Sequence, residues 1–520
     1  MPLLSHLKTS LKLKVKYQCY TTTASQRVNK IRSKSNQEYE VNIGLEIHTQ
    51  LNTNEKLFST SNNLFTSKVN QNINCYDSSY PGVLPILNQD CLKKAVELII
   101  AINGTIQPHS SFDRKHYFYP DMPQGYQITQ KYEPIGKGGS ISLNYLDGLS
   151  YPLEINIEQV QLEQDSGNLI QEENNVKINL NRVNVPLIEL VTRPDFINSL
   201  EVVTFIKKYQ TLVRSLGVSL ADLEIGTLRC DINLSIKEYN SKIMGNKIEL
   251  KNLNNFKIIR KAIDYEIQRQ IELIESSQLI LPETRSYNQQ LKKTYKLRTK
   301  QTSEDYRYMN EPDLPRIKIS PSLIESIKTQ LPVTPYELLI QWEKQYKLNN
   351  IQLNAVLPLI HEPKATEFLN NCIKLQPKLD FSQLTHWLSS ILLGILSKQK
   401  LTFKNITITE KQFLSVINEF NLNNINSKTS KYLIIKMLNG DLRLAKEIIQ
   451  QEDLGLIKDE TILLPIINKL IKENSIKFKK LKESKDKRQM AWFLGKIMLL
   501  TENKACPEKV NQLLMKIEIK

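Results

Sequence analysis

Apolar and polar residues mostly alternate between residue 38 and about residue 190, a segment that also contains many turn-forming residues. The clearest alternation covers residues 41–48, where Val, Ile, Leu and Ile are each followed by a polar residue or glycine. Because successive side chains of a strand point to opposite faces, this pattern predicts a half-buried strand whose polar face carries Glu46 and His48. The same criterion predicts strands at 153–163, 185–192, 227–236 and 247–251.

Helical spacing is also found within this first part of the chain. Apolar residues three and four positions apart predict helices at 88–103 and 200–216. The aromatic and charged run 112–130 is expected to be a loop. Residues 136–140 have the glycine and lysine content of a phosphate-binding loop, but the alternating residues after them favour a hairpin turn.

After the proline-rich segment 311–335 the pattern is helical only. Helices are predicted at 335–346, 383–396, 410–420, 430–438, 442–450, 461–473 and 489–500. The fold class is therefore α+β, with a largely antiparallel sheet in the N-terminal domain and all-α helical and tail domains after it. The expected divisions are 1–37, 38–322, 323–400 and 401–520.

Composition excludes several classes of protein. The 520 residues are 40% hydrophobic and 24% charged, which suits about two to four folded domains. No run of about 18 apolar residues occurs, so no membrane insertion is expected. The six cysteines are scattered without a Cys-x-x-Cys pair, which argues against a disulfide framework or a cysteine zinc site and favours a reducing compartment.

The net charge of +16 is unevenly distributed. Residues 1–37 contain eight Lys and Arg and no acidic residue, and therefore carry half of the excess. A basic, Ser/Thr-bearing, acid-free N-terminus is typical of an organellar transit peptide, and the alternative is a disordered basic arm that binds RNA. The remaining positive charge favours a polyanionic partner.

A second cationic run lies near the C-terminus. Its seven cations occur within twelve residues: Lys477, Lys479, Lys480, Lys482, Lys485, Lys487 and Arg488. Such a run is either a solvated face or a surface that contacts nucleic-acid phosphates, where it would release counterions on binding.

Candidate chemistry begins with Glu46 and His48, because P-loop, protein-kinase, H-E-x-x-H and G-x-S-x-G motifs are all absent from the sequence. A carboxylate beside an imidazole on one strand face is a common pair of ligands for a divalent metal. Glu189 interrupts a run that should be buried, and Glu163 ends another predicted strand. A buried carboxylate needs a cationic partner, which is either a metal or an arginine such as Arg193 or Arg182.

Two further predicted strands carry mixed charge on one face. Arg229 and Asp231 alternate with apolar residues in the first, and Glu249 and Lys251 in the second. Acidic residues with nearby cations are what magnesium-assisted phosphoryl transfer needs, because the metal bridges phosphates and the cations neutralise developing charge.

Several short strings in this order resemble a known family. They are IGLEIH at 43–48, YPGVLP at 80–85, FDRK and YFYPD within 112–121, GTLRCD at 226–231, ELKNLN at 249–254, and DYRY and EPDLP within 305–315. They are similar to the B subunits of the glutamyl-tRNA(Gln)/aspartyl-tRNA(Asn) amidotransferases, the GatB family. The WFLGK and VNQLL strings at 492–496 and 510–514 resemble the tail domain of that family.

The resemblance implies an ATP- and Mg²⁺-dependent ligase. It would phosphorylate the glutamate side chain of Glu-tRNA(Gln), and ammonia from a partner amidase subunit would then displace phosphate to give Gln-tRNA(Gln). A cradle-like first domain would hold the amidase subunit together with a small third subunit, and the helical tail would bind tRNA. With the basic N-terminus, the resemblance predicts the mitochondrial matrix as the location.

The resemblance also implies roles for individual residues. The metal and catalytic residues carry over onto Glu46, His48, Glu163 and Glu189. Nucleotide or acyl-phosphate binding carries over onto Arg229, Asp231 and Lys251.

Two positions depart from the family pattern. Gln164 stands where many relatives have an acid, so an ionisable role there is in doubt. Cys75 is followed three residues later by Ser78 rather than a second cysteine, so no zinc is predicted. Two other functions stay open: a non-catalytic tRNA-binding scaffold and a metal-dependent nucleotide hydrolase.

Overall fold

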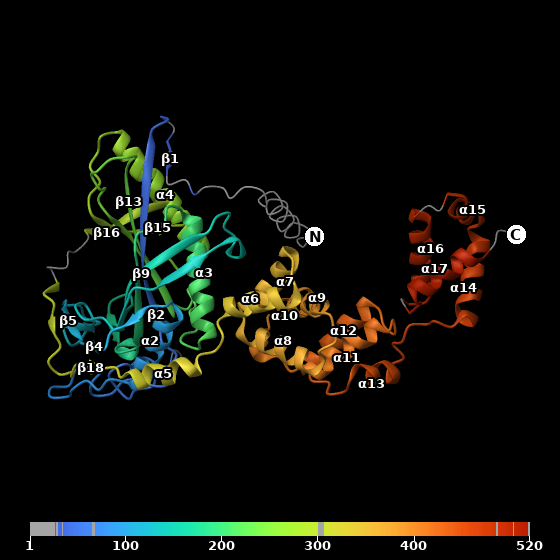
Figure 1. Cartoon of the computed structure of the whole chain (residues 1–520), viewed down its shortest axis with the longest axis horizontal. Helices are drawn as coiled ribbons and strands as arrows, with labels where there is room; N and C mark the ends of the chain where they lie inside the picture. Colours follow the sequence, from blue (N-terminus) through green and yellow to red (C-terminus); the bar gives the residue numbers. More distant parts are fainter. Residues whose placement is uncertain are drawn as a thin grey trace. The chain divides into compact units, whose positions relative to one another are not determined.

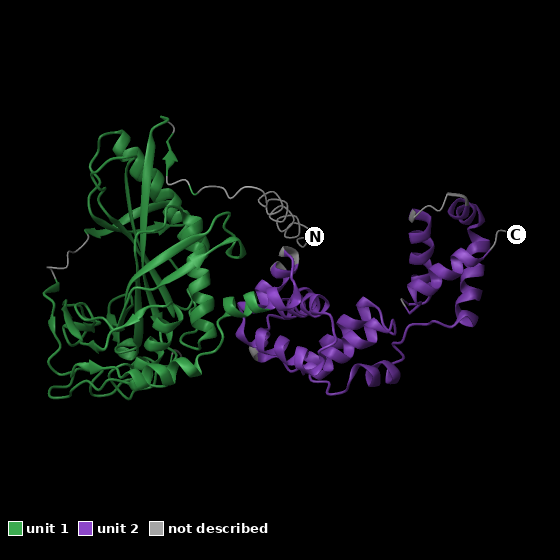
Figure 2. Cartoon of the chain, viewed as in Figure 1, with its two compact units in different colours: residues 1–341 green, residues 342–520 purple. Residues whose placement is uncertain are grey.

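The computed structural model describes residues 27, 30–33, 35–64, 68–299, 306–484, 487–502 and 504–517. The chain divides into two compact units, which meet in sequence between Gln341 and Trp342 (Figure 2). Among the described residues, the first unit contains all the strands and the second is helical, so the predicted α+β class is confirmed. No helix in the described ranges is both long and apolar enough to cross a bilayer.

An 11-stranded sheet forms the centre of the first unit (Figure 1). Its main path runs, in spatial order, through β16 (Lys293–Thr299), β15 (Glu283–Asn288), β14 (Ile248–Leu250), β13 (Leu228–Glu238), β2 (Glu38–Gln50), β12 (Pro186–Thr192), β9 (Leu153–Gln164), β7 (Gly136–Lys137) and β3 (Thr105–Ile106). Off this path, β1 (Ile31–Arg32) pairs with β2 and β8 (Ser140–Leu143) pairs with β9. All pairs are antiparallel except β14–β15, as the prediction of a largely antiparallel sheet requires.

Three helices cover one face of this sheet: α2 (Gln89–Ala101), α3 (Ser199–Ser215) and α4 (Phe256–Glu275). The apolar residues of β2, including Ile43, Leu45 and Ile47, are buried in the same core as Phe205 of α3 and Ile263 of α4. The apolar residues that alternate along the strand, and those three to four positions apart in the helices, therefore form the buried face of each element. The polar residues of β2 are left on the opposite face.

Smaller sheets and one helix complete the unit. They are β10 (Asn168–Gln171) with β11 (Val176–Asn179), β5 (Asp113–His116) between β6 (Tyr126–Thr129) and β17 (Met309–Asn310), and β4 (His109–Ser110) with β18 (Ile317–Lys318), followed by α5 (Pro321–Gln330). The loop expected at 112–130 is wrong in part, because β5 and β6 lie within it. These short strands carry mostly charged and polar residues, so no alternating apolar pattern marks them.

The hairpin turn expected at 136–140 is also wrong. Residues 136–143 run beside β9 in one continuous register, with Gly136 opposite Val160 and Ser140 opposite Asn156. Gly138 and Gly139 have φ angles of 68° and 91°, and a Cβ on Gly139 would come within 2.6 Å of the Ile102 carbonyl oxygen. The two glycines therefore let an otherwise extended segment pass close to the end of α2.

The helices from α6 onward lie in the purple part of Figure 2 or at its boundary. They are α6 (Pro335–Tyr346), α7 (Asn350–Ile360), α8 (Pro363–Leu375), α9 (Phe381–His386), α10 (Leu393–Gln399), α11 (Glu410–Asn421), α12 (Ser427–Leu438), α13 (Ala445–Gln451), α14 (Glu460–Glu473), α15 (Ser475–Ser484), α16 (Lys487–Leu500) and α17 (Pro507–Lys516). A π-helical turn over Trp387–Leu392 joins α9 to α10. The last four helices share their own core, which includes Leu463, Phe493 and Leu514.

Candidate active site

A row of polar side chains crosses the sheet on the face opposite α3 and α4. His48 on β2 lies directly between Glu189 on β12 and Arg229 on β13. On the far side of β12, Gln161 of β9 is paired with Glu189. Because paired residues of antiparallel strands project to the same face, this register alone brings the four side chains together.

His48, Glu163 and Glu189 form the first acidic cluster. The His48 Nε2 atom lies 3.8 Å from Glu163 Oε1 and 3.9 Å from Glu189 Oε2. One ligand atom from each residue fits within 4.8 Å of the others, which suits a single divalent cation. Gln127 Nε2 donates to Glu163 Oε1 at 2.8 Å and Gln161 Nε2 donates to Glu189 Oε2 at 2.5 Å, so amide groups orient both carboxylates.

The surroundings of Glu189 disfavour the ionised form of its carboxyl group. Burial and the neighbouring Glu163 carboxylate raise the pKa of Glu189 to about 7, against an ordinary value of 4.5. Both arginines that the sequence offered as partners for Glu189 pair with other carboxylates, Arg193 with Glu158 and Arg182 with Asp165. His48 and the Lys115 ammonium lower the pKa of Glu189 by less than burial and the neighbouring carboxylates raise it, so the cluster can accept the added charge of a divalent metal.

Glu46 lies in a second cluster, with Asp231 and Glu249. It faces Asp231 across the β2–β13 ladder and accepts a hydrogen bond from Asn233 Nδ2 at 2.9 Å. Lys251 enters this cluster, with its Nζ 2.5 Å from Asp231 Oδ2 and 3.7 Å from Glu249 Oε1. The four predicted metal ligands are thus divided, with Glu46 separated from the other three.

Arg229, predicted to contact nucleotide or acyl phosphate, is already paired. Its Nη2 donates to Asp165 Oδ2 at 2.8 Å, and Arg182 Nη2 donates to the same oxygen at 2.5 Å. Burial raises the pKa of Asp165, but the two guanidinium groups outweigh burial and hold the pKa below its ordinary value. Asp165 therefore stays ionised and neutralises much of the charge on Arg229.

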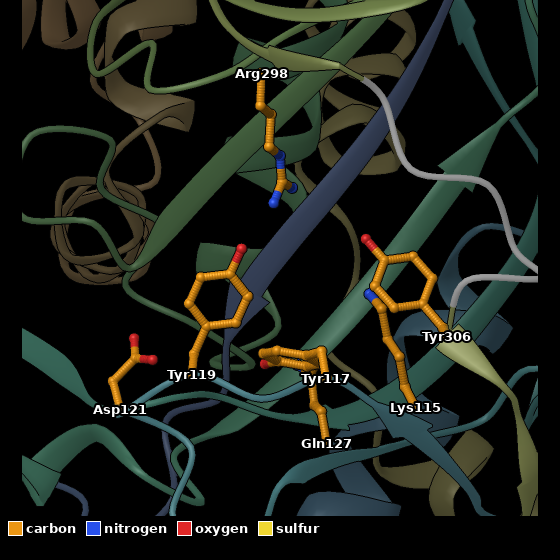
Figure 3. A pocket seen from close by; sticks show the side chains of 7 residues that line it. All are labelled: Lys115, Tyr117, Tyr119, Asp121, Gln127, Arg298 and Tyr306. Atoms are coloured by element: carbon orange, nitrogen blue, oxygen red, sulfur yellow. The ribbon is translucent and has the colours of Figure 1, made fainter.

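A pocket of about 250 Å³ lies beside the first cluster (Figure 3). It is lined by Lys115, Tyr117, Tyr119, Asp121, Gln127, Arg298 and Tyr306. Gln127 links the pocket to the cluster through its hydrogen bond to Glu163. Burial lowers the pKa of Lys115, but the fields of Glu163 and Glu189 outweigh burial and raise the pKa above its ordinary value, so the ammonium stays charged.

Comparison with known proteins places this site in a family. Residues 41–325 match the model of the GatB/GatE catalytic domain, and residues 367–517 match that of the GatB domain. The chain belongs to the GatB family. The first match contains both acidic clusters and all of the pocket, and the second contains α9 to α17.

Named members of the GatB family align with this chain over most of its length. The mitochondrial B subunit of glutamyl-tRNA(Gln) amidotransferase from Dictyostelium discoideum is 37% identical over 499 residues, or 93% of this chain and 91% of the relative. The corresponding mitochondrial protein of Naegleria gruberi is 34% identical, covering 92% and 94%. The B subunit of aspartyl/glutamyl-tRNA(Asn/Gln) amidotransferase from Wolbachia, strain wRi, is 36% identical, covering 92% and 98%.

The cationic run of the tail lies mainly on α15. Lys479 and Lys480 are exposed there, and Arg488 at the start of α16 is also exposed. Lys477 Nζ lies 3.9 Å from the centroid of the Trp492 ring, and Lys482 Nζ donates to the Met515 carbonyl oxygen at 2.6 Å. Lys485 lies outside the described residues, and the side chain of Lys487 is not described.

Most of the predicted transit segment 1–37 also lies outside the described residues. Its last part is folded onto the first unit: β1 pairs with β2, and Arg27 Nε donates to Glu201 Oε1 at 3.0 Å. Glu201 is fully buried at the start of α3 and accepts a second bond from Arg27 Nη2 at 2.9 Å.

Gln164 and Cys75 are the two positions that depart from the family pattern. Both lie in parts of the first unit that contain buried polar groups. Gln164 is buried and donates to Gln124 Oε1 at 3.1 Å, at the end of β9. The segment around Cys75 is organised by Asp77, which is fully buried with Lys56 at an Nζ–Oδ2 distance of 3.1 Å. A buried ion pair thus occupies the middle of this loop.

Sequence reasoning did not select Lys115, Gln127, Gln161, Arg298 or the tyrosines as site residues. Lys115 stood within the FDRK string that carried the family resemblance, but nothing local indicated which side chains of that string point inward. Gln127 reaches the cluster through the approach of β6 to β9, and Gln161 reaches it through the pairing of β9 with β12. Such contacts depend on pairing between distant strands, which the sequence pattern does not specify.

Binding of a divalent metal to the first cluster should depend on pH. Because the pKa of Glu189 is raised to about 7, its carboxyl is protonated at pH 6 and must lose a proton before it can coordinate. Affinity for Mn²⁺, titrated calorimetrically with the complex, is expected to fall by up to about tenfold per pH unit below 7 and to level off above it. Equal affinity at pH 6 and pH 8 would contradict the role given to Glu189.

Proposed function

We propose that the chain is the phosphorylating and amidating subunit of a mitochondrial glutamyl-tRNA(Gln) amidotransferase. Using ATP, it activates the glutamate of Glu-tRNA(Gln), and ammonia from a partner amidase completes Gln-tRNA(Gln). The observation that carries this proposal is the His48, Glu163 and Glu189 cluster beside a pocket with cationic side chains, in a chain of the GatB family.

The chemistry requires activation of the carboxylate. Ammonia does not expel oxide from a carboxylate at a useful rate, whereas phosphate is a competent leaving group. The γ-carboxylate oxygen of glutamate attacks the γ-phosphorus of ATP, and ADP leaves. Ammonia then attacks the acyl carbon, the bond to phosphate breaks, and an amide is formed.

The residues of the first cluster provide the donor set for the metal. His48, Glu163 and Glu189 would hold Mg²⁺, which would supply positive charge to offset the charge of the phosphates. Gln127 and Gln161 keep the two carboxylates pointed into the cluster. Lys115 adds positive charge beside them, which favours the approach of an anionic substrate to an otherwise acidic site.

The proposed reaction needs ammonia, which a partner subunit would supply. The family name denotes one subunit of a larger enzyme, and the proposed assembly contains the amidase subunit together with a small third subunit. The basic N-terminus and the mitochondrial relatives support the mitochondrial matrix as its location.

Trapping of the intermediate tests this function. The complex is incubated with Glu-tRNA(Gln), ATP, Mg²⁺ and hydroxylamine, without glutamine. An acyl phosphate reacts with hydroxylamine, so glutamyl hydroxamate on the tRNA is the expected product, and it should depend on ATP. A scaffold gives no ATP-dependent γ-hydroxamate on the glutamate side chain, and a nucleotide hydrolase consumes ATP without forming it.

The cations of the tail are proposed to contact tRNA phosphates. Replacing Lys479, Lys480 and Arg488 with Gln is expected to weaken tRNA binding regardless of sequence. The slope of log affinity against log salt concentration should fall by about one for each phosphate-binding cation that is removed. Filter binding over a range of salt concentrations measures both effects.

A matched control is available in the same unit. Lys411 on α11 and Lys428 and Lys431 on α12 are exposed, and their replacement with Gln removes the same number of charges elsewhere. If both sets of variants lowered affinity and slope equally, the run on α15 would be only one part of a diffuse basic surface. An unchanged slope in the α15 variant would make that run a solvated face.

A further inference from the structure

The predicted transit segment 1–37 overlaps residues that are folded onto the first unit. Strand β1 pairs with the start of β2, and Ile31 of β1 packs against the core. Beside it, Lys30 Nζ lies 2.9 Å from Glu38 Oε2 and 5.1 Å from the centroid of the Tyr239 ring. Loss of the whole segment would therefore remove a strand and its packing from the folded unit.

Arg27, just before this strand, reaches a fully buried carboxylate. Its Nε and Nη2 atoms donate to the two carboxylate oxygens of Glu201 at 3.0 Å and 2.9 Å, and Nη2 also donates to the Asp195 carbonyl oxygen. The Glu201 side chain is 0% exposed and lies in the first turn of α3. A guanidinium that contacts both oxygens of a carboxylate holds it in a defined geometry. Arg27 is thus fixed to a residue 174 positions further along the chain.

The other groups that contact Glu201 are neutral. Tyr151 Oη donates to Glu201 Oε1 at 2.6 Å, and the Ile197 backbone nitrogen donates to Oε2 at 2.9 Å. The N-terminus of α3 adds only partial positive charge. In the described part of the chain, Arg27 is the only cation within ion-pair distance of Glu201. Loss of Arg27 would therefore leave a buried negative charge without a counter-ion, which strongly destabilises a fold.

The residues before Arg27 have the composition of a transit peptide by themselves. Residues 1–26 contain four lysines, seven Ser and Thr, and no acidic residue. Transit peptides carry positive charge, are rich in serine and are poor in acidic residues. A cut before Arg27 can therefore remove a targeting segment and leave every contact of Arg27 in place.

We propose that an endopeptidase of the mitochondrial matrix cuts the chain after residue 26 or earlier, so that the mature subunit keeps Arg27 as the counter-ion of Glu201. Water hydrolyses one peptide bond, which gives the leader a new carboxylate and the mature chain a new amino group. The proposal rests on the mitochondrial location given with the proposed function. It ends the removable segment before residue 27 rather than at residue 37.

The N-terminus of the mature subunit tests the position of the cut. The complex is purified from mitochondria, its α-amino groups are labelled, and the labelled N-terminal peptide is identified by mass spectrometry after digestion. The expected N-terminus lies between residues 3 and 27. A mature chain that begins at residue 28 or later would overturn the proposal, and so would a chain that keeps Met1 or Pro2.

Thermal unfolding of the complete complex tests the role of Arg27. Arg27→Met is expected to lower the melting temperature of this subunit by at least about 4 °C, and Arg27→Lys by less, because an ammonium keeps the charge. Arg32→Met is the matched control, since Arg32 is exposed and pairs with Glu38 at the surface, and a shift below about 1 °C is expected. Equal shifts in Arg27→Met and Arg32→Met would overturn the proposal.

Two further constructs separate the buried charge from the rest of the segment. Arg27→Met combined with Glu201→Gln should recover part of the loss, because no unpaired carboxylate then remains buried. Complexes are also made with chains that begin at Ser25 or at Lys30, each after an initiating methionine. The chain from Ser25 should melt like the mature subunit, and the chain from Lys30 should lose at least as much as Arg27→Met. Equal melting temperatures of these two chains would contradict the need for Arg27.

The position of the cut and the proposed function fail in different ways. If the mature chain keeps Arg27 but the complex forms no glutamyl hydroxamate, the proposed activity is wrong and the cut stands. If hydroxamate forms and the mature chain begins after Arg27, the activity stands and the cut is wrong. An uncleaved, active chain found in the cytosol would overturn the location and the cut together.

Discussion

Replacing Glu189 with Gln is expected to lower Glu-tRNA(Gln)-dependent phosphorylation by at least about a hundredfold. The substitution removes one of three metal ligands and leaves an amide of nearly the same shape, so metal binding suffers more than packing. The measurement is the single-turnover rate of glutamyl hydroxamate formation at saturating ATP. Glu158→Gln on β9 is the matched control, since Glu158 is exposed and its carboxylate pairs with Arg193 at the surface.

The same variant should be more stable than wild type when metal is removed. The folded-state pKa of Glu189 is raised from 4.5 to about 7, so this carboxyl destabilises the fold increasingly as pH rises from 4.5 to 7, and by a constant amount above pH 7. With EDTA at pH 8, Glu189→Gln is expected to melt about 2 °C or more higher than wild type. The difference should shrink as pH falls toward 4.5, because the wild-type carboxyl is then neutral in both states.

If Glu189→Gln is more stable than wild type and has lost phosphorylation activity, the carboxylate of Glu189 serves function rather than folding. A purely structural Glu189 would give the opposite result, because its replacement would lower the melting temperature at pH 8. Normal phosphorylation in the variant would remove Glu189 from the metal site altogether.

Replacing Asp77 with Leu is expected to destabilise the first unit by about 3–5 kcal/mol. The substitution leaves the Lys56 ammonium fully buried without its counter-ion. Four other donors also lose their acceptor: Ser59 Oγ, Ser61 Oγ, Asn74 N and Asn184 Nδ2. Urea denaturation of the complex, monitored at the transition of this subunit, measures the loss.

Double substitution shows whether the ion pair is responsible. Lys56→Met alone should cost less than Asp77→Leu, since Asp77 keeps its four other hydrogen-bond donors. Combining Lys56→Met with Asp77→Leu should recover part of the loss, because no unpaired charge then remains buried. Strictly additive losses would contradict a direct coupling between Lys56 and Asp77.

Much of the fold could be predicted from periodicity, because each side chain pattern reflects burial along a single element. The alternation over 41–48 correctly placed Glu46 and His48 on one polar face of β2. Predicted strands at 153–163, 185–192 and 227–236 agree with β9, β12 and β13 to within two residues. Helix α4 shows similar spacing of its isoleucines, although no element was predicted there.

The site could be predicted only in part, because register between strands decides which side chains meet. Glu46 and His48 are two residues apart on β2, yet pairing with β13 directs Glu46 to Asp231, and pairing with β12 brings His48 to Glu189. Gly138 and Gly139 show the same dependence on context. A glycine pair suggests a turn, but these two glycines are needed because the chain passes close to the end of α2.

The central claim is tested most directly by ATP consumption in the purified complex. Mg²⁺ and ATP are supplied with Glu-tRNA(Gln), with uncharged tRNA, or without tRNA, for wild type and for His48→Ala. The account predicts hydrolysis that requires Glu-tRNA(Gln) and is lost in His48→Ala, whose imidazole is one of the three ligands of the first cluster. ATP consumption that is indifferent to tRNA, or that survives in His48→Ala, would contradict it.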